Sequence, residues 1–419
     1  MKPTGTGLRS VVLAALLLGI ISPIAAGLIQ TGRAAFGLMP VVGAHGSGLE
    51  VWRSLCALPG FWTSVRLTLW IGFAATFLSL TLATCFCATA HARMTGRSAA
   101  RWLAPLLAAP HTAVAIGLAF VLAPSGWIAR LLAPLVGWVR PPDLALINDP
   151  WGIALILGLM IKEIPFLLLV MLAALSQIPV QQHMAAARGL GYRRSVVWVK
   201  IIAPQVWPLI RLPVLVVLAY SLSTVEMGII LGPSNPPVFS VFVMRLFMAP
   251  DLAMILPASA GALMLAFLMG VASATLFVAE RLVRYTGLWW IRAGGRSSTV
   301  KPLLRIASLC VVALFVIGAL AMVSLVFWSL AWRWPWPSML PETWSFQPWR
   351  NAAGVLGSAL GNTLLIAGAS VFVSLALAIL WLEGEDRKGR GRAGWGEVLI
   401  YLPLLLPQIA FLYGLNMLF

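Results

Sequence analysis

The stretch that decides the fold reads Ala185-Ala186-Ala187-Arg188-Gly189-Leu190-Gly191 and continues to Ile201-Ile202-Ala203-Pro204. It lies between two long apolar runs and carries four basic residues, namely Arg188, Arg193, Arg194 and Lys200. The alanines predict a helical turn whose small side chains let another protein approach closely. Gly191 predicts a left-handed stop to that turn. The segment from Arg193 to Ile202 predicts a second short helix that Pro204 ends, because proline removes a helical hydrogen bond.

The composition around this stretch is that of a membrane protein. Of the 419 residues, 61% are hydrophobic and only 10% are charged, and the mean hydropathy is +0.95. A soluble domain is about one quarter charged, so we predict an all-α polytopic membrane protein. The net charge of +17 comes from basic residues at the ends of apolar runs. It indicates membrane topology and contact with anionic lipid rather than binding to nucleic acid.

The sequence offers no catalytic or metal chemistry of its own. Cys85, Cys87 and Cys310 lie inside apolar runs, which leaves Cys56 alone outside them and favours neither a disulfide nor a metal site. No Walker A, His-Glu-x-x-His or Gly-x-Ser-x-Gly pattern occurs, so we expect no catalytic residue and no ATP bound by this chain. A polytopic enzyme would need clustered polar residues at one interface, and Asp143 and Asp149 are too few.

Nine apolar runs are long enough to cross a bilayer. They span residues 8–29, 61–90, 102–123, 151–175, 207–230, 254–278, 303–330, 356–382 and 398–419. The first run has the length of an uncleaved anchor, although the small residues Ala25-Ala26-Gly27 leave a cleaved signal peptide as the alternative. When Lys and Arg are counted in alternate loops, 19 lie on one side and 8 on the other. The excess predicts a cytoplasmic amino terminus and a cytoplasmic Ala185 loop.

Part of the chain repeats. Thr68-Leu69, Ile71, Phe77, Ser79-Leu80 and Leu82-Ala83 recur as Thr363-Leu364, Ile366, Phe372, Ser374-Leu375 and Leu377-Ala378, at an offset of 295. Pro110, Ala113 and Gly117 recur as Pro407, Ala410 and Gly414, at an offset of 297. Repeats of this kind build a pathway between two halves. The second copy of the Ala185 loop would fall near position 482, so we expect an incomplete second half. The alternative is a one-loop variant that completes itself by dimerising.

The Ala185 stretch resembles the EAA loop of ABC-transporter permeases of the binding-protein-dependent family. That pattern is Glu-Ala-Ala, three residues, Gly, nine residues and Ile-x-Leu-Pro. Ala186, Ala187, Gly191, Ile201 and Pro204 fall in register, whereas Ala185 replaces the Glu and Ala203 replaces the Leu. With two halves in one chain, the plan is similar to the double-length thiamine and iron(III) permeases. The resemblance implies a type I ABC importer transmembrane fold, with nine spans visible of roughly twelve.

The resemblance also implies partners. It implies two cytoplasmic ATPase subunits, which use ATP and Mg²⁺, a periplasmic substrate-binding protein, and a location in the bacterial inner membrane. It assigns the ATPase-coupling loop, within residues 181–204, to Ala185, Ala186, Ala187, Gly191, Ile201 and Pro204. Arg188, Arg193 and Arg194 join this loop by position. It further divides the chain into an amino-terminal span and periplasmic loop (1–60), a first permease domain (61–284), a cytoplasmic linker (285–302) and the start of a second permease domain (303–419).

Three charged residues inside spans are candidates for a substrate pathway. Lys162 and Glu163 lie in the middle of the run 151–175, where a charge costs about 2.5–3.5 kcal/mol. Glu226 lies near the outer end of its run, beside Gly228, where we expect the helix to break. A structural role, with each charge neutralised locally, is the alternative for all three. The rival function is an ion-coupled secondary transporter that uses these charges without ATP.

Overall fold

The computed structural model describes residues 5–46, 48–91, 96–296, 301–388 and 401–417. Within them the chain is predominantly helical, which confirms the all-α prediction, and eight helical segments are long and apolar enough to cross a membrane. Two antiparallel hairpins, Leu38–Met39 with Ala44–His45 (β1, β2) and Ala331–Arg333 with Thr343–Trp344 (β3, β4), are the only described sheets.

The helices follow the predicted runs in order. In the first half they are α1 (Gly5–Leu16), α2 (Ser22–Ala35), α3 (Glu50–Ala57), α4 (Phe61–Ala90), α5 (Gly96–Ala108), α6 (His111–Leu122), α7 (Trp127–Val136), α8 (Ile153–Ser176) and α9 (Val180–Gly189). They continue as α10 (Arg194–Val197), α11 (Ala203–Ser223), α12 (Glu226–Leu231), α13 (Phe239–Phe247), α14 (Ile255–Arg292), α15 (Lys301–Leu330), α16 (Gln347–Lys388) and α18 (Gln408–Asn416).

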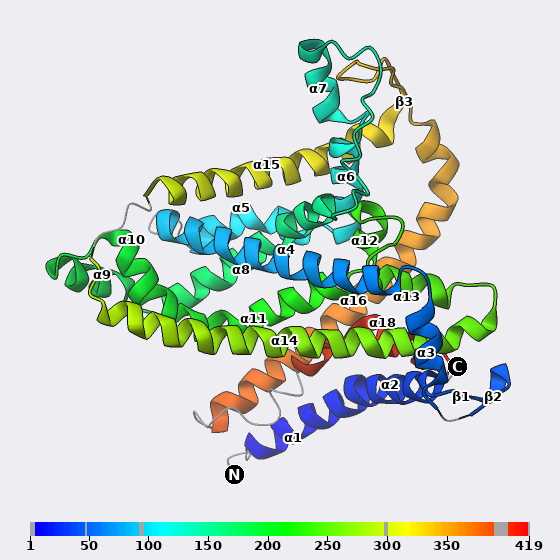
Figure 1. Ribbon diagram of the computed structural model, residues 1–419, viewed down its shortest axis with the longest axis horizontal. Helices are drawn as coiled ribbons and strands as arrows, with labels where there is room; N and C mark the ends of the chain where they lie inside the picture. Colours follow the sequence, from blue (N-terminus) through cyan, green and yellow to red (C-terminus); the bar gives the residue numbers. More distant parts are fainter. Residues whose placement is uncertain (1–4, 47, 92–95, 297–300, 389–400, 418–419) are drawn as a thin grey trace.

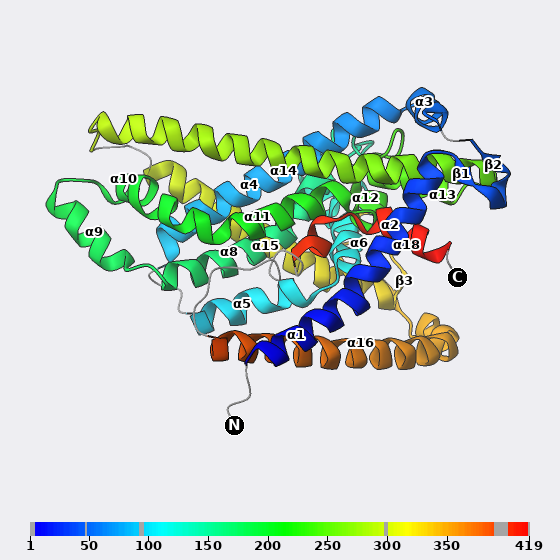
Figure 2. The same cartoon turned by 90° about the horizontal axis from the view of Figure 1, so that it is seen from below.

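Most of the long helices, among them α4, α8, α14 and α15, lie side by side along one axis of the molecule, whereas α16 runs obliquely to them in Figure 1 (Figures 1 and 2). The centre of this bundle is α8, which packs against α4, α5 and α11. Within its most apolar 18-residue stretch, 72% is buried inside the molecule. The short helices α9 and α10 lie at one end of the bundle, and α3 and the β1–β2 hairpin lie at the other. The loop around Gly191 is therefore presented at one end of the bundle.

Two predicted spans are broken, and these predictions were wrong. The run 102–123 forms two helices, because Pro110 takes an extended conformation (ψ 145°) and starts α6 in a new direction (Figure 1). The run 207–230 ends as α11 at Ser223 and restarts as α12 at Glu226, with Thr224 extended (ψ 126°) between them. We expected this break at Gly228, but it lies four residues earlier, at Thr224.

The last predicted span, 398–419, lies partly outside the described residues. Its described part is a short 3-10 turn, Leu402–Leu405, followed by the nine-residue helix α18. The first span is longer than predicted: α1, a π-helical turn at Leu17–Ile21 and α2 form one helix as far as Ala35.

The two matched proline blocks begin helices in the same way. Pro110 and Pro407 are both extended residues that directly precede a helix, α6 and α18. In each helix the matched glycine marks a close crossing. A Cβ atom added at Gly117 would overlap the carbonyl of Ala321 in α15, and one added at Gly414 would overlap the carbonyl of Gly27 in α2. The helix after each of the two prolines thus crosses closely over a long helix far away in the sequence.

Candidate functional site

The loop begins with α9 and stops at Gly191. This glycine has φ +84°, so the predicted left-handed stop is confirmed. The Gly191 amide donates to the Arg188 carbonyl (2.9 Å) and the Tyr192 amide donates to the Ala187 carbonyl (3.1 Å), which satisfies carbonyls at the helix end. Leu190 is left on the surface with 64% of its side chain exposed.

The helix after Gly191 does not end at Pro204, contrary to our prediction. It runs without a break from Arg194 to Ser223, over 30 residues. A π-helical turn at Trp198–Ile202 makes this continuation feasible, because the Ala203 amide donates to Trp198, five residues back. Pro204 follows directly after this wider turn, at the start of α11, so the turn accommodates the proline ring and its missing N–H. One continuous helical rod therefore joins the loop to the middle of the bundle.

The residues assigned to the loop divide into an outer and an inner set. Ala185, Ala186, Arg188 and Pro204 are exposed, as are Arg193 and Arg194. Ala187, only 3% exposed, packs with Met184 and Val197 in a small core, and Ile201 lies half-buried beside it. The outer set offers small side chains and positive charge to a partner, whereas Ala187 and Ile201 hold α9 against the helix that follows.

Lys200 ties this loop to the end of α14. Its Nζ atom donates to the carbonyls of Trp290 (3.1 Å) and Gly295 (3.0 Å), and it lies 4.5 Å from the centre of the Trp290 ring. The Arg193 amide adds a bond to the Arg296 carbonyl (3.1 Å). Sequence reasoning found the charge of Lys200 but not its partners, because nothing in the local pattern links residues about 90 positions apart.

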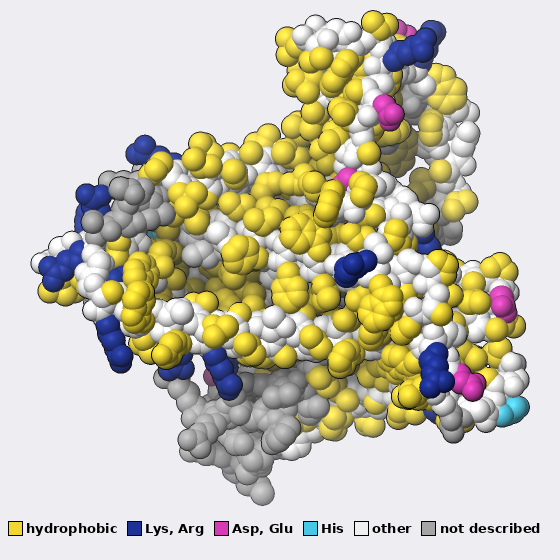
Figure 3. Space-filling model, viewed as in Figure 1, with side chains coloured by type: hydrophobic (Ala, Val, Ile, Leu, Met, Phe, Trp, Pro, Cys, Tyr) yellow, Lys and Arg dark blue, Asp and Glu magenta, His cyan; other side chains and the backbone are white. Residues whose placement is uncertain are grey.

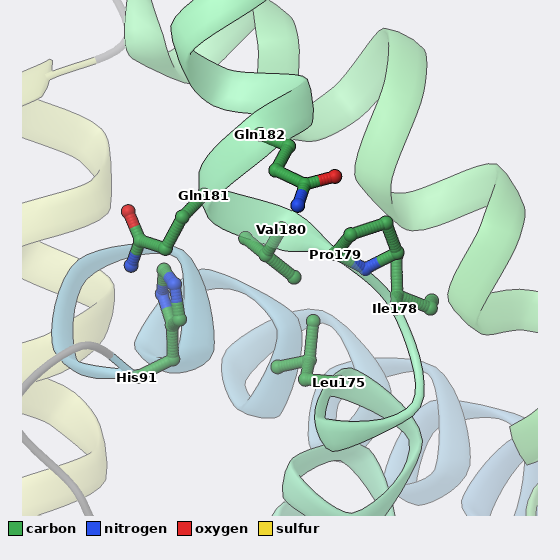
Figure 4. A pocket seen from close by; sticks show the side chains of 7 residues that line it. All are labelled: His91, Leu175, Ile178, Pro179, Val180, Gln181 and Gln182. Carbon is green, nitrogen blue, oxygen red and sulfur yellow. The ribbon is translucent and has the colours of Figure 1, made fainter.

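A shallow pocket of about 420 Å³ opens beside the loop, where α8 turns into α9 (Figure 4). It is lined by His91, Leu175, Ile178, Pro179, Val180, Gln181 and Gln182. The His91 Nδ1 atom bonds to the Cys87 carbonyl (2.9 Å), and its Nε2 atom has no partner among the described residues. Burial lowers the pKa of His91 below its ordinary value, and the nearby Arg194 adds to this effect.

Lys162 holds the broken end of α5. Its Nζ atom donates to the carbonyls of Leu106 (2.7 Å), Leu107 (3.1 Å) and Ala109 (2.7 Å). These carbonyls have lost their helical partners because α5 stops before Pro110. The buried ammonium also faces the negative end of the helix dipole. Lys162 is therefore satisfied by backbone alone.

Glu163 faces another helix interface. Its carboxylate accepts hydrogen bonds from the hydroxyl of Ser79 in α4 (3.0 Å) and from the hydroxyl of Ser221 in α11. It is 4% exposed and does not pair with Lys162. The two neighbours in sequence point to different sides of α8, as helical geometry requires. Glu163 thus ties three long helices together at the middle of the bundle.

Glu226 lies at the other side of the α5–α6 break. Its carboxylate accepts a hydrogen bond from the Thr112 hydroxyl (2.7 Å) in the first turn of α6. The positive end of the helix dipole stabilises a negative charge at this place. The ring of the adjacent His111 lies 4.6 Å from that of Tyr220 at the end of α11. The structure therefore brings Lys162 and Glu226 to the two ends of one helix break. Among the described residues no group of His, Cys, Asp and Glu could hold a metal ion.

No model of a known protein family matches the sequence. One curated protein, the inner membrane ABC transporter permease protein YnjC of Escherichia coli (strain K12), is 29% identical over 310 residues. The chain is similar to an ABC transporter permease. The match covers 74% of this chain and 52% of the relative, so the chain spans about half the length of the curated relative that it matches. The eight candidate membrane spans agree with a multi-pass membrane protein.

Proposed function

We propose that the chain is the permease subunit of an ABC importer, which forms the substrate pathway and couples it to cytoplasmic ATPase subunits. The observation that carries this proposal is the similarity to an inner membrane ABC transporter permease over 310 residues. The loop geometry supports it, because the small outer residues Ala185 and Ala186, the exposed Leu190 and three arginines form one accessible surface.

Coupling would run through one helix. The rod from Arg194 to Ser223 is about 45 Å long. It begins at the loop and reaches Ser221, which donates to Glu163 at the centre of the bundle. Closure of the ATPase pair would push on α9 and move this rod as a rigid body. The movement would displace the helix break at Thr224, beside Glu226. This displacement would open the pathway alternately to the two sides of the membrane.

The loop end would face the cytoplasm. Lys and Arg side chains gather over the end of the molecule that holds α9 and α10 (Figure 3), as positive-inside topology predicts. The amino terminus would then be cytoplasmic, and a periplasmic substrate-binding protein would dock at the opposite end. Two ATPase copies, which use ATP and Mg²⁺, would complete the transporter.

Binding of the ATPase tests this proposal. The full chain is expressed in its host together with each ABC ATPase subunit that the host encodes, and ATPase retained on washed membrane vesicles is measured. We expect retention by the wild type, and loss of retention and of ATP-driven uptake in Ala186→Trp and Gly191→Pro at unchanged membrane levels. Gly270→Trp, which is exposed in α14 with nothing within 4 Å of an added Cβ, is the matched control.

Two results would overturn the proposal. One is the absence of ATPase from wild-type vesicles. The other is normal binding and uptake in both loop variants. Uptake that an uncoupler abolishes while ATP is held constant would favour the ion-coupled secondary transporter instead.

A further inference from the structure

We propose that one face of α16 is a docking surface for a membrane-embedded helix that carries a carboxylic acid at mid-span. This inference rests on the two-half plan of the proposed pathway and goes beyond it, because it specifies the chemistry of an interacting helix. The docking face is defined by Thr363, Ile366, Ser374 and Ala378.

Helix α16 is the least covered of the long helices. No residue in the most apolar 18-residue stretch of Gln347–Gly384 is buried, although α16 touches α1 and α15. Lipid alone can cover an apolar helix, so this exposure by itself does not call for a partner. The identity of the exposed residues, however, does point to a partner.

The four residues of the docking face match four buried residues of α4. Thr68, Ile71, Ser79 and Ala83 recur at the same spacing as Thr363, Ile366, Ser374 and Ala378. Ile71 is 1% exposed whereas Ile366 is 63% exposed, and the other three pairs differ in the same way. Offsets of 3, 11 and 15 residues place all four on one side of a helix. By contrast Phe77 and its match Phe372 are exposed in both helices.

The polar members of the α4 face have specific partners. The Ser79 hydroxyl donates to the carboxylate of Glu163 in α8, and the Thr68 hydroxyl accepts from the Phe239 amide (2.7 Å) at the start of α13. In α16 the Thr363 hydroxyl instead donates to the Ala359 carbonyl of its own helix (2.8 Å). The same residues in the same arrangement would suit the same kind of neighbour, a helix with a buried acid facing the serine.

A second copy of this chain does not fit as the occupant. Its Glu163 is already buried and bonded to its own Ser79 and Ser221, and its α8 is enclosed by α4, α5 and α11. To dock there, the second copy would have to open its own centre. We therefore assign the docking face to a different transmembrane helix, one that carries a carboxylic acid at mid-span as α8 does.

Spin labels measure whether the face is covered. Single nitroxides are attached to the full chain at Ser374→Cys, Thr363→Cys and the control Phe372→Cys, each in a variant whose four native cysteines are replaced by serine, in vesicles of the expressing host. We expect the labels at 363 and 374 to be immobilised and several times less accessible to oxygen than the label at 372. Equal oxygen accessibility at all three positions would mean that lipid covers the face, which would overturn the proposal.

A carbodiimide soluble in the bilayer identifies the occupant. Ser374→Lys places an amine on the face. The carbodiimide converts a carboxyl group beside it to an O-acylisourea, and the amine attacks this ester to form an amide while the carbodiimide leaves as its urea. We expect mass spectrometry to find this amide to an Asp or Glu of a transmembrane helix outside α8, and none in the Phe372→Lys control. An amide to Glu163 of a second copy, or no amide although the nitroxide is protected, would overturn the proposal. Retention of the ATPase on vesicles is measured in a separate experiment. A failure of the proposed docking face can therefore be distinguished from a failure of the proposed permease function.

Discussion

Two lysines in different regions of the molecule perform the same task. Lys162 lies in the middle of the bundle and Lys200 lies at the basic end, and their side chains are 5% and 7% exposed. Each donates to carbonyls at the carboxyl end of a helix that neither belongs to, α5 for Lys162 and α14 for Lys200. In both places a lysine far away in the sequence supplies the missing donors to carbonyls at a helix end.

The surroundings of the two lysines differ. Three backbone carbonyls are the bonding partners of Lys162, in an apolar region where water does not replace a lost bond. Lys200 makes two such bonds and also lies against the rings of Trp290 and Tyr192, at 4.5 and 5.9 Å. The comparison teaches that the break in α5 depends on one side chain, whereas the contact with α14 is shared among several groups.

Removal of Lys162 should have the largest effect. In Lys162→Met the carbonyls of Leu106, Leu107 and Ala109 lose their donor in an apolar environment, and we expect a loss of about 3 kcal/mol. The measurement is the thermal unfolding midpoint of purified protein in detergent. Lys162→Arg, which keeps the charge and donors, is the matched control and should lose less. A methionine variant as stable as the wild type would show that these bonds do not support the α5 break.

Removal of Lys200 should have a smaller effect. In Lys200→Met two hydrogen bonds and the contact with Trp290 are lost, and we expect a loss of about 1–2 kcal/mol. Hydrogen exchange should locate the change at the end of α14, around residues 285–296, with the centre of α8 unaffected. If Lys200→Met destabilised the protein more than Lys162→Met, the proposed difference between the two regions would be wrong.

A third basic side chain, His91, sharpens the comparison because burial disfavours its charged form. Burial lowers its pKa, so near and below its unfolded pKa of about 6.5 the unfolded chain binds a proton more readily than the folded chain does. Stability should therefore fall as the pH falls from 7.5 to 5.0, by the smallest effect of the three. The unfolding midpoint of His91→Asn should depend less on pH over this range. An unchanged pH dependence would assign it to other groups.

Much of the fold was predictable because its signals are local. Long apolar runs predicted the spans, since a bilayer accepts only segments whose backbone is hydrogen-bonded internally. The left-handed stop at Gly191 was also predictable from a local signal, because only glycine adopts that conformation readily. The prolines were less informative. Pro110 breaks its span, whereas Pro204 does not, because a π-helical turn before it widens the helix.

The candidate site was predictable in its residues and not in its contacts. Lys162, Glu163 and Glu226 were recognisable as charges in apolar runs, where any charge requires a partner. Their partners come from α5, α4 with α11, and α6, as many as 114 residues away in sequence. No periodicity encodes such distances.

The sequence by itself determined that this is a helical membrane protein, where most of its helices lie and where the loop stops at Gly191, because hydropathy and backbone preference act over a few residues. Only the tertiary structure decided that the helix from Arg194 reaches Ser221, that two lysines terminate distant helices, and that Lys162 and Glu226 hold opposite ends of one break. These contacts depend on packing between segments far apart in the chain, because a buried charge is stable only where a fold supplies its partner.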